Sequence, residues 1–166
     1  MSLSDRKYKR MPMREVGELA FHIQKPKKGV DYKLKAAYAE PTGKGDLLII
    51  EGFFGRMFRS DEGCVRDELD EFSRKYHEIC QRYDDDPAHE YYEVMSYDDL
   101  FYLHGLIPAV GPTGWGYTNT PDYRVSSIDF DVYLVTEGEW VDKLGEKYLY
   151  YCPKEYCTPD PCYLEV

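Results

Sequence analysis

The end of the chain carries a C-x4-C-x4-C series that suits metal ligation, formed by Cys152, Cys157 and Cys162. Because structural zinc takes four tetrahedral ligands, a fourth ligand has to come from elsewhere in the fold. The candidates are Cys64, His77 and Cys80. The alternative is that all five cysteines are reduced thiols, since a chain of 166 residues can build a core without metal or disulfides. We predict no cofactor, with a zinc site as the alternative.

The other residue types that do chemistry occur without the spacing that their chemistry needs. The four histidines form no H-E-x-x-H pair, and no serine stands in a nucleophile elbow. The glycine-rich loop 111–116 has neither a Walker lysine nor the G-x-G-x-x-G order, so phosphate binding is not indicated. The aromatic stretch 51–58 resembles an RNA-recognition strand, but Glu51 stands where a basic residue is needed. We therefore expect a protein that is not an enzyme.

Charge is distributed unevenly along the chain, whose formal net charge is -10. Residues 1–60 hold 13 Lys and Arg against seven Asp and Glu. Residues 61–100 hold four against 14, and residues 101–166 hold four against ten. Direct binding to nucleic acid is disfavoured, because the overall negative field repels phosphates. A protein partner with a basic surface is favoured instead, since complementary charge raises association rate and specificity.

The acidic segment 61–100 supplies most of the candidate partner-binding site. The site is centred on the run 84–86 and includes two aromatic side chains of the following loop. The predicted contact residues are Asp67, Glu68, Asp84, Asp85, Asp86, Glu90, Glu93, Trp115 and Tyr117. Such a surface would present carboxylates to a basic groove as a surrogate for nucleic acid. The alternative is an acidic face that only keeps the protein soluble.

The strongest structural pattern is an amphipathic helix over residues 64–83. Its apolar residues recur mostly at intervals of three and four, which places them in one stripe along a helix. They are Val65, Leu69, Phe72, Tyr76, Ile79, Cys80 and Tyr83. Ser60 and Asp61 can cap the start of this helix, and Pro87 prevents a long continuation. The predicted helix therefore carries much of the acidic site.

Weaker patterns predict the remaining elements. Ser96 and the acidic residues after it suit the capped start of a second helix over 97–104. Residues 30–39 fit either a strand or a short helix, and residues 108–121 are expected to form a loop. Strands are expected within 46–58, 90–95, 125–135 and 147–152.

Helices and strands follow one another without a regular βαβ alternation, which indicates an α+β fold. We predict a single domain over residues 14–166, with a mostly antiparallel sheet packed against the long helix 64–83 and the shorter helix 97–104. Residues 1–13 are expected to form a mobile basic arm. No apolar run reaches the roughly 20 residues of a membrane span, and the basic start lacks the apolar core of a signal peptide. We expect a cytoplasmic protein without membrane association.

The stretch 95–132 combines three short motifs in a fixed order. Residues 96–106 are SYDDLFYLHGL, and they are followed by Gly114-Trp115-Gly116 and by Ile128-Asp129-Phe130. This order resembles a block in uncharacterised phage and prophage proteins of gut Firmicutes. In those proteins a short helix with a Gly-Leu corner precedes a glycine-tryptophan loop and an Ile-Asp-Phe strand. The resemblance is confined to this stretch and implies a phage setting, without an activity.

Together these observations predict a small, acidic, non-catalytic protein that binds a basic protein partner. With the resemblance, we expect a phage-encoded inhibitor that mimics nucleic acid and binds a nucleic-acid-handling protein in the host cytoplasm. The first alternative is a phage structural or assembly component that forms homo-oligomers. The second is a zinc-binding protein or metal-dependent enzyme that uses Cys152, Cys157 and Cys162.

Overall fold

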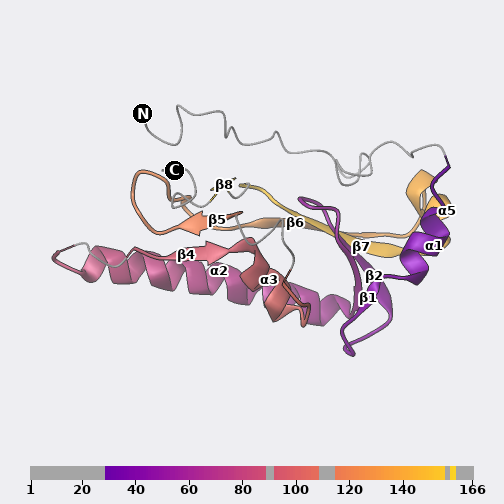
Figure 1. Ribbon diagram of the computed structural model, residues 1–166, viewed down its shortest axis with the longest axis horizontal. Helices are drawn as coiled ribbons and strands as arrows, with labels where there is room; N and C mark the ends of the chain where they lie inside the picture. Colours follow the sequence, from indigo (N-terminus) through magenta and orange to yellow (C-terminus); the bar gives the residue numbers. More distant parts are fainter. Residues whose placement is uncertain (1–28, 89–91, 109–114, 156–157, 160–166) are drawn as a thin grey trace. The chain divides into compact units, whose positions relative to one another are not determined.

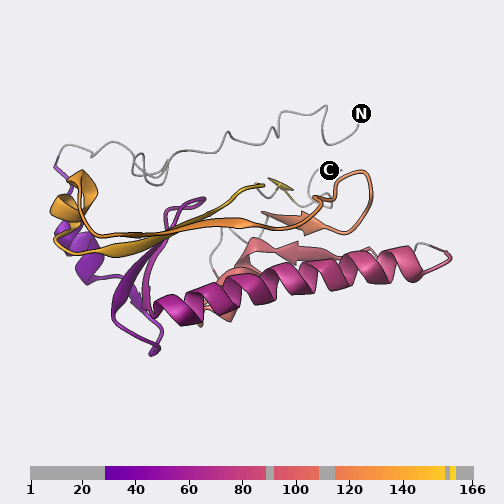
Figure 2. The same cartoon turned by 180° about the vertical axis from the view of Figure 1, so that it is seen from behind.

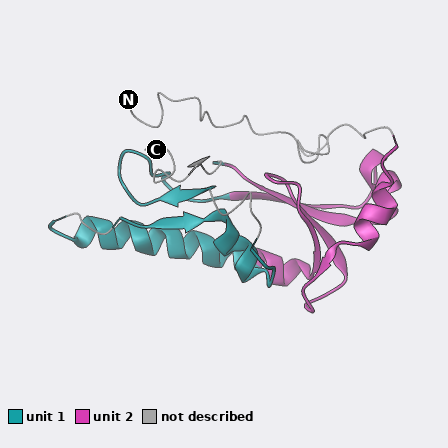
Figure 3. Cartoon of the chain, viewed as in Figure 1, with its two compact units in different colours: residues 1–11, 67–129, 155–166 teal, residues 12–66, 130–154 magenta. Residues whose placement is uncertain are grey.

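The structure is a computed structural model, and it describes residues 29–88, 92–108, 115–155 and 158–159 (Figures 1 and 2). These residues form helices and both parallel and antiparallel strand pairs, so the predicted α+β class is confirmed. The chain divides into two compact units, neither of which is one continuous stretch (Figure 3). Unit 1 comprises residues 1–11, 67–129 and 155–166, and unit 2 comprises residues 12–66 and 130–154.

Unit 2 contains a five-stranded sheet with the order β1-β3-β2-β7-β6 (Figure 1). Its strands are β1 (Glu40–Pro41), β2 (Leu47–Glu51), β3 (Met57–Ser60), β6 (Phe130–Val135) and β7 (Tyr148–Pro153). The pairs β2–β3 and β6–β7 are antiparallel, whereas β1–β3 and β2–β7 are parallel. The expected antiparallel pairing is thus present, but this sheet is mixed.

The stretch 46–58, in which β structure is predicted, contains most of the hairpin of β2 and β3, whose turn includes Gly52 and Gly55. The backbone N–H of Glu51 donates to the carbonyl of Arg56 at 2.9 Å, which closes the turn. Gly55 has a φ of 77°, in the left-handed region where a side chain is strained. Residues 48–51 are fully buried, so β2 lies at the centre of the core of unit 2.

The strands β6 and β7 correspond to the two strands that were predicted at 125–135 and 147–152. All six residues of β7 are buried, in agreement with the strand expected at 147–152. β6 begins only at Phe130, so the prediction of a strand from residue 125 was wrong by five residues. Apolar and polar residues alternate over 127–134, which predicts alternating buried and exposed side chains, but this prediction is also wrong, because the neighbours Tyr133 and Leu134 are 39% and 43% exposed. The reason is that β6 stands at the end of the strand order.

Two short helices of unit 2 pack on each other. α1 (Tyr32–Ala37) decides the ambiguous segment 30–39 in favour of a helix, and the carboxylate of Asp31 accepts a hydrogen bond from the N–H of Leu34 at 3.1 Å. α5 (Glu139–Leu144) follows Gly138, between two of the predicted strands, where the sequence analysis predicts no helix. The rings of Tyr32 and Trp140 meet edge to face, with centroids 5.1 Å apart.

α2 (Glu62–Asp85) confirms the helix predicted over 64–83 and extends it by two residues at each end. Six of its seven predicted apolar positions are buried, and Tyr83 is half-buried. At its start the carboxylate of Asp61 accepts a hydrogen bond from the N–H of Cys64 at 3.2 Å, as expected of a cap. Neither α2 nor any other helix in the described ranges has the length and apolar character needed to cross a bilayer.

Unit 1 combines most of α2 with a three-stranded antiparallel sheet of the order β4-β5-β8. Its strands are β4 (Val94–Ser96), β5 (Trp115–Thr118) and β8 (Thr158–Pro159). β5 corrects the expectation that residues 108–121 form only a loop. The ring of Tyr117 in β5 packs edge to face on Phe72 and Tyr76 of α2, with centroid distances of 6.1 and 5.9 Å. The core of unit 1 therefore lies between α2 and this sheet.

The second predicted helix is α3 (Tyr97–Leu103), which ends one residue earlier than expected. Ser96 and Asp99 form a reciprocal capping box at its start. Gly105 has a φ of 91° and Leu106 is buried, so the helix ends in a Gly-Leu corner.

Candidate functional site on the long helix

The negative charge of the described residues gathers in unit 1. There, 14 Asp and Glu stand against four Lys and Arg, whereas unit 2 has 11 against nine. The corresponding formal net charges are -10 and -2. In unit 2, Arg56 pairs with Glu40 at 2.7 Å and lowers the pKa of that carboxyl group, and Arg59 pairs with Glu146. The imbalance of charge is therefore a property of unit 1.

The outward side of α2 carries an acidic stripe, which we define as Asp67, Glu71, Glu78 and Asp85. These positions share one side because a helix turns once in 3.6 residues, and they lie opposite the buried stripe. Arg74 lies among them and pairs with Glu71 at 2.6 Å and with Glu78. Its guanidinium lowers the pKa of Glu71. The stripe extends about 27 Å along the helix and retains a negative charge.

Two of the predicted contact residues are neutralised by arginines of the same unit. Asp84 accepts two hydrogen bonds from Arg124, at 3.0 and 3.1 Å. Glu93 pairs with Arg82 at 3.2 Å. These two carboxylates therefore contribute less negative potential to a partner than their number suggests.

The other predicted residues of the acidic run differ in their surroundings. Asp85 is exposed and accepts a hydrogen bond from the side chain of Gln81 at 2.9 Å. Asp86 accepts one from the backbone N–H of Ala88 at 3.2 Å. Glu90 lies outside the described residues.

The remaining predicted residues divide between surface and core. Asp67 is exposed in the acidic stripe, whereas Glu68 lies 2.8 Å from Nδ1 of the fully buried His104. Trp115 is half-buried at the start of β5. Tyr117 is buried, and its hydroxyl donates to the carbonyl of Glu155 at 2.7 Å. Tyr117 therefore supports the sheet beneath α2 and does not extend the exposed acidic surface.

The predicted metal ligands are not brought together by the part of the chain that the structure describes. Cys152 is buried in β7 of unit 2, and Cys157 and Cys162 lie outside the described residues. Within the described ranges no group of three His, Cys, Asp or Glu side chains is arranged to hold a metal ion. Cys80 belongs to the buried stripe of α2, where burial raises the pKa of its thiol. The zinc alternative remains a prediction.

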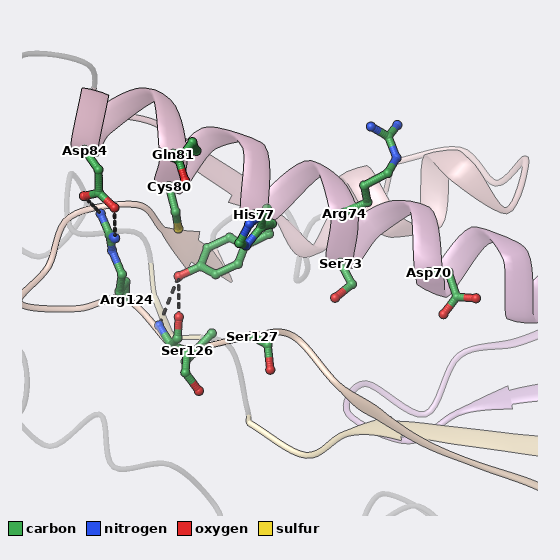
Figure 4. Close-up of a pocket in the computed structure, with 12 residues that line it drawn as sticks. Asp70, Ser73, Arg74, His77, Cys80, Gln81, Asp84, Arg124, Ser126 and Ser127 are labelled. Carbon is green, nitrogen blue, oxygen red and sulfur yellow. Dashed lines mark hydrogen bonds and ion pairs between the residues drawn. The ribbon is translucent and has the colours of Figure 1, made fainter. Parts of the chain in front are cut away.

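A groove of about 450 Å³ runs between α2 and residues 124–127 in unit 1 (Figure 4). One wall consists of polar side chains of α2, and the other is formed by the segment that follows Tyr123. Polar residues that line it include Asp70, Ser73, His77, Asp84, Ser126 and Ser127. The groove adjoins the acidic stripe because both lie on the exposed half of the same helix.

Tyr76 holds the two walls of the groove together. Its hydroxyl donates to the carbonyl of Thr118 at 2.8 Å and accepts from the N–H of Val125 at 3.0 Å. Burial raises the pKa of this phenol, so it stays protonated and able to donate. The position was predicted as core from helical periodicity, but its hydrogen bonds reach across more than 40 residues and have no local signal in the sequence.

Asn119 organises the end of the groove and was missed by the sequence analysis. It is fully buried; its side-chain amide donates to the carbonyl of Ile79 at 2.9 Å and accepts from the N–H of Glu93 at 2.9 Å. Its backbone carbonyl accepts from Nε of Arg124 at 3.1 Å. Asn119 thereby fixes the arginine that binds Asp84.

Comparison with known proteins identifies no relative of this chain. No protein-family model matches it, and no match was found among curated proteins or solved structures.

Proposed function

We propose that this protein is a non-catalytic binding protein whose unit 1 presents carboxylates to the basic surface of a protein partner. The observation that carries the proposal is the net charge of -10 on the described residues of that unit. Three of its four cations, Arg74, Arg82 and Arg124, pair with carboxylates of the same unit. The carboxylates of unit 1 that are not in these three pairs keep the unit negatively charged, and their field attracts a basic partner.

Such a field acts mainly on the rate of association. Carboxylates distributed along one helix steer a basic surface toward the molecule before contact, and the attraction weakens when salt shortens the screening length. A second copy of the same chain would bring like charges together at this face. A basic protein is therefore favoured over a homo-oligomer through α2.

We further propose that the partner handles nucleic acid and that this protein is a phage-encoded inhibitor acting in the host cytoplasm. The support is the resemblance over residues 95–132 and the carboxylates that recur along α2. A protein that binds nucleic acid offers a basic surface that recurring carboxylates can occupy in place of phosphates. Duplex DNA or RNA added in excess should then compete with this protein for the captured partner. Binding that no nucleic acid competes with would remove this narrower proposal.

The experiment captures the partner from an extract of the native source and measures its association rate with charge-reversed variants. Asp67→Lys with Asp85→Lys alters two exposed stripe residues that pair with no cation in the described part of the chain. At about 0.05 M salt we expect association to slow by about tenfold or more, and the difference should shrink at about 0.5 M salt. Both substitutions are on the surface of a helix, so this double variant should keep its fold.

The matched control is Asp46→Lys with Glu137→Lys, which changes the net charge equally but in unit 2. Its association rate should stay within about twofold of the unchanged protein. Equal slowing by both pairs would show that only the total charge matters, and unchanged association of the stripe variant would refute the proposed surface.

A further inference from the structure

The groove of unit 1 has a carboxylate of α2 toward each end. Asp70 and Asp84 are 14 residues apart, which is about 21 Å of helix, and they lie on the same side of α2. Figure 4 shows both side chains directed toward the wall that contains Ser126 and Ser127. The two carboxylates therefore stand in comparable positions along one groove.

The end at Asp84 is already occupied by a guanidinium of the chain itself. Arg124 contacts both carboxylate oxygens of Asp84 and donates to the carbonyl of Asn119. Its guanidinium carbon also lies 5.7 Å from the ring centroid of Tyr83, within the range of a cation–π contact. This end shows how the groove accommodates an arginine side chain.

At the other end, Asp70 is paired with no cation among the described residues. Asp70 is exposed, and it takes part in no ion pair or hydrogen bond in the described part of the chain. The two arginines nearest in sequence are paired with other acids: Arg66 with Glu62, and Arg74, which also lines the groove, with Glu71 and Glu78. The negative charge of Asp70 is therefore left facing the groove.

The side chains beside Asp70 suit a planar cation with several donors. Ser73 and His77 follow it on the same side of α2 and offer a hydroxyl and an imidazole, and Ser127, the nearer of the two wall serines in Figure 4, offers a hydroxyl from the other wall. A guanidinium can place two of its five N–H groups on a carboxylate and direct others to such acceptors. A volume of about 450 Å³ also lies within the range of sites that enclose small ligands.

We infer that the Asp70 end of the groove binds an arginine side chain of the partner. This inference rests on the proposed function and specifies its contact: the acidic stripe attracts the basic surface, and the groove takes one of its guanidinium groups. An anionic ligand is disfavoured, because Arg74 and Arg124 are both engaged by carboxylates.

The test uses the full chain labelled with ¹⁵N and the probe N-acetyl-arginine amide, followed by NMR. We expect saturable shifts of the amide signals of Asp70, Ser73, His77 and Ser127. The neutral isostere N-acetyl-citrulline amide should produce none of them, because it has no charge for Asp70 to pair with. Equal shifts with both probes, or no shift at these residues with either, would overturn the inference.

Paired variants separate the groove from the general field of the helix. Asp70→Asn should weaken binding of the arginine probe by about tenfold or more, whereas Asp67→Asn, one turn away in the acidic stripe, should change it less than about twofold. Equal weakening would mean that the probe responds only to net charge.

The two proposals also fail differently. If association of the partner is slowed by Asp67→Lys with Asp85→Lys but not by Asp70→Asn, the proposal of an acidic binding surface stands and the proposed arginine site in the groove is excluded. A partner that is insensitive to both sets would remove the proposed function, whatever the probe does.

Discussion

Glu51 is a carboxyl group with no exposed surface, at the point where β2 turns toward β3. Burial raises its pKa to about 8, although the backbone N–H groups of Phe53 and Phe54 oppose this shift. The N–H of Phe54 lies 2.5 and 3.1 Å from the two carboxylate oxygens. Glu51 therefore supports the turn, at the cost of burying an ionisable group.

Glu51 makes stability depend on pH in a defined direction. Below pH 4.5 the group is protonated in both the folded and the unfolded chain, so its contribution to stability is complete. Between pH 4.5 and about 8 the unfolded chain loses the proton while the folded chain keeps it, so stability falls as pH rises.

Glu51→Gln should remove this dependence, because the amide oxygen can still accept from Phe54 but cannot ionise. At pH 8 we expect the variant to be more stable than the unchanged protein by on the order of 4 kcal/mol, and near pH 4.5 the two should be similar. Urea unfolding across this pH range measures the difference. The exposed Glu137→Gln serves as control, and a Glu51→Gln variant with the same pH profile as the unchanged protein would contradict the prediction.

The pairing of β4 with β5 depends on a close approach of two backbones at Gly116. A Cβ at this position would overlap the carbonyl oxygen of Met95 and lie 2.9 Å from Cγ1 of Val94. Both neighbours belong to β4, and Ser96 is paired directly with Gly116. Because β5 carries Tyr117 against α2, the glycine determines how closely the sheet of unit 1 is assembled.

Gly116→Ala should destabilise unit 1 by about 1–3 kcal/mol, as overpacking does when backbone atoms cannot move aside. Urea unfolding followed by fluorescence of Trp115 measures this loss. Gly63→Ala, in the first turn of α2, is the control, since its nearest neighbour is a side-chain oxygen of Asp61 at 3.2 Å and alanine favours the helix. Equal free energies of unfolding for the two variants would show that β4 and β5 can move apart without loss of stability.

Each unit contains one of the two tryptophans of the chain, Trp115 in unit 1 and Trp140 in unit 2. The units differ in charge, at -10 and -2 for their described residues, and like charges in one compact unit repel each other. Salt that screens this repulsion should therefore stabilise unit 1 more than unit 2.

Variants with a single tryptophan, Trp140→Phe and Trp115→Phe, report the units separately. When salt is raised from about 0.02 M to about 0.5 M, the urea midpoint reported by Trp115 should rise more than that reported by Trp140. Coincident midpoints at both salt concentrations would show that the units unfold together and that charge does not distinguish them.

Local patterns in the sequence were sufficient for the elements that depend on their own residues. The helix α2 was predictable because its apolar stripe repeats over five turns, and α3 because Ser96 and Asp99 cap it within one turn. The hairpin of β2 and β3 was predictable as β structure with a bend because Gly52 and Gly55 interrupt its apolar run. The strand β5 was not predictable, since its four residues follow a loop rich in glycine and proline and are too few to show a pattern.

The sequence by itself also determined the excess of acid and its concentration after residue 60. Only the tertiary structure decided which carboxylates are available: Arg124 occupies Asp84 from 40 positions away, whereas Asp70 faces the groove without a cation in the described residues. The complete burial of Glu51 and the hydrogen bonds of Asn119 likewise depend on the tertiary structure. The physical reason is that charge is a property of each residue, whereas burial and pairing depend on segments that meet only when the chain folds.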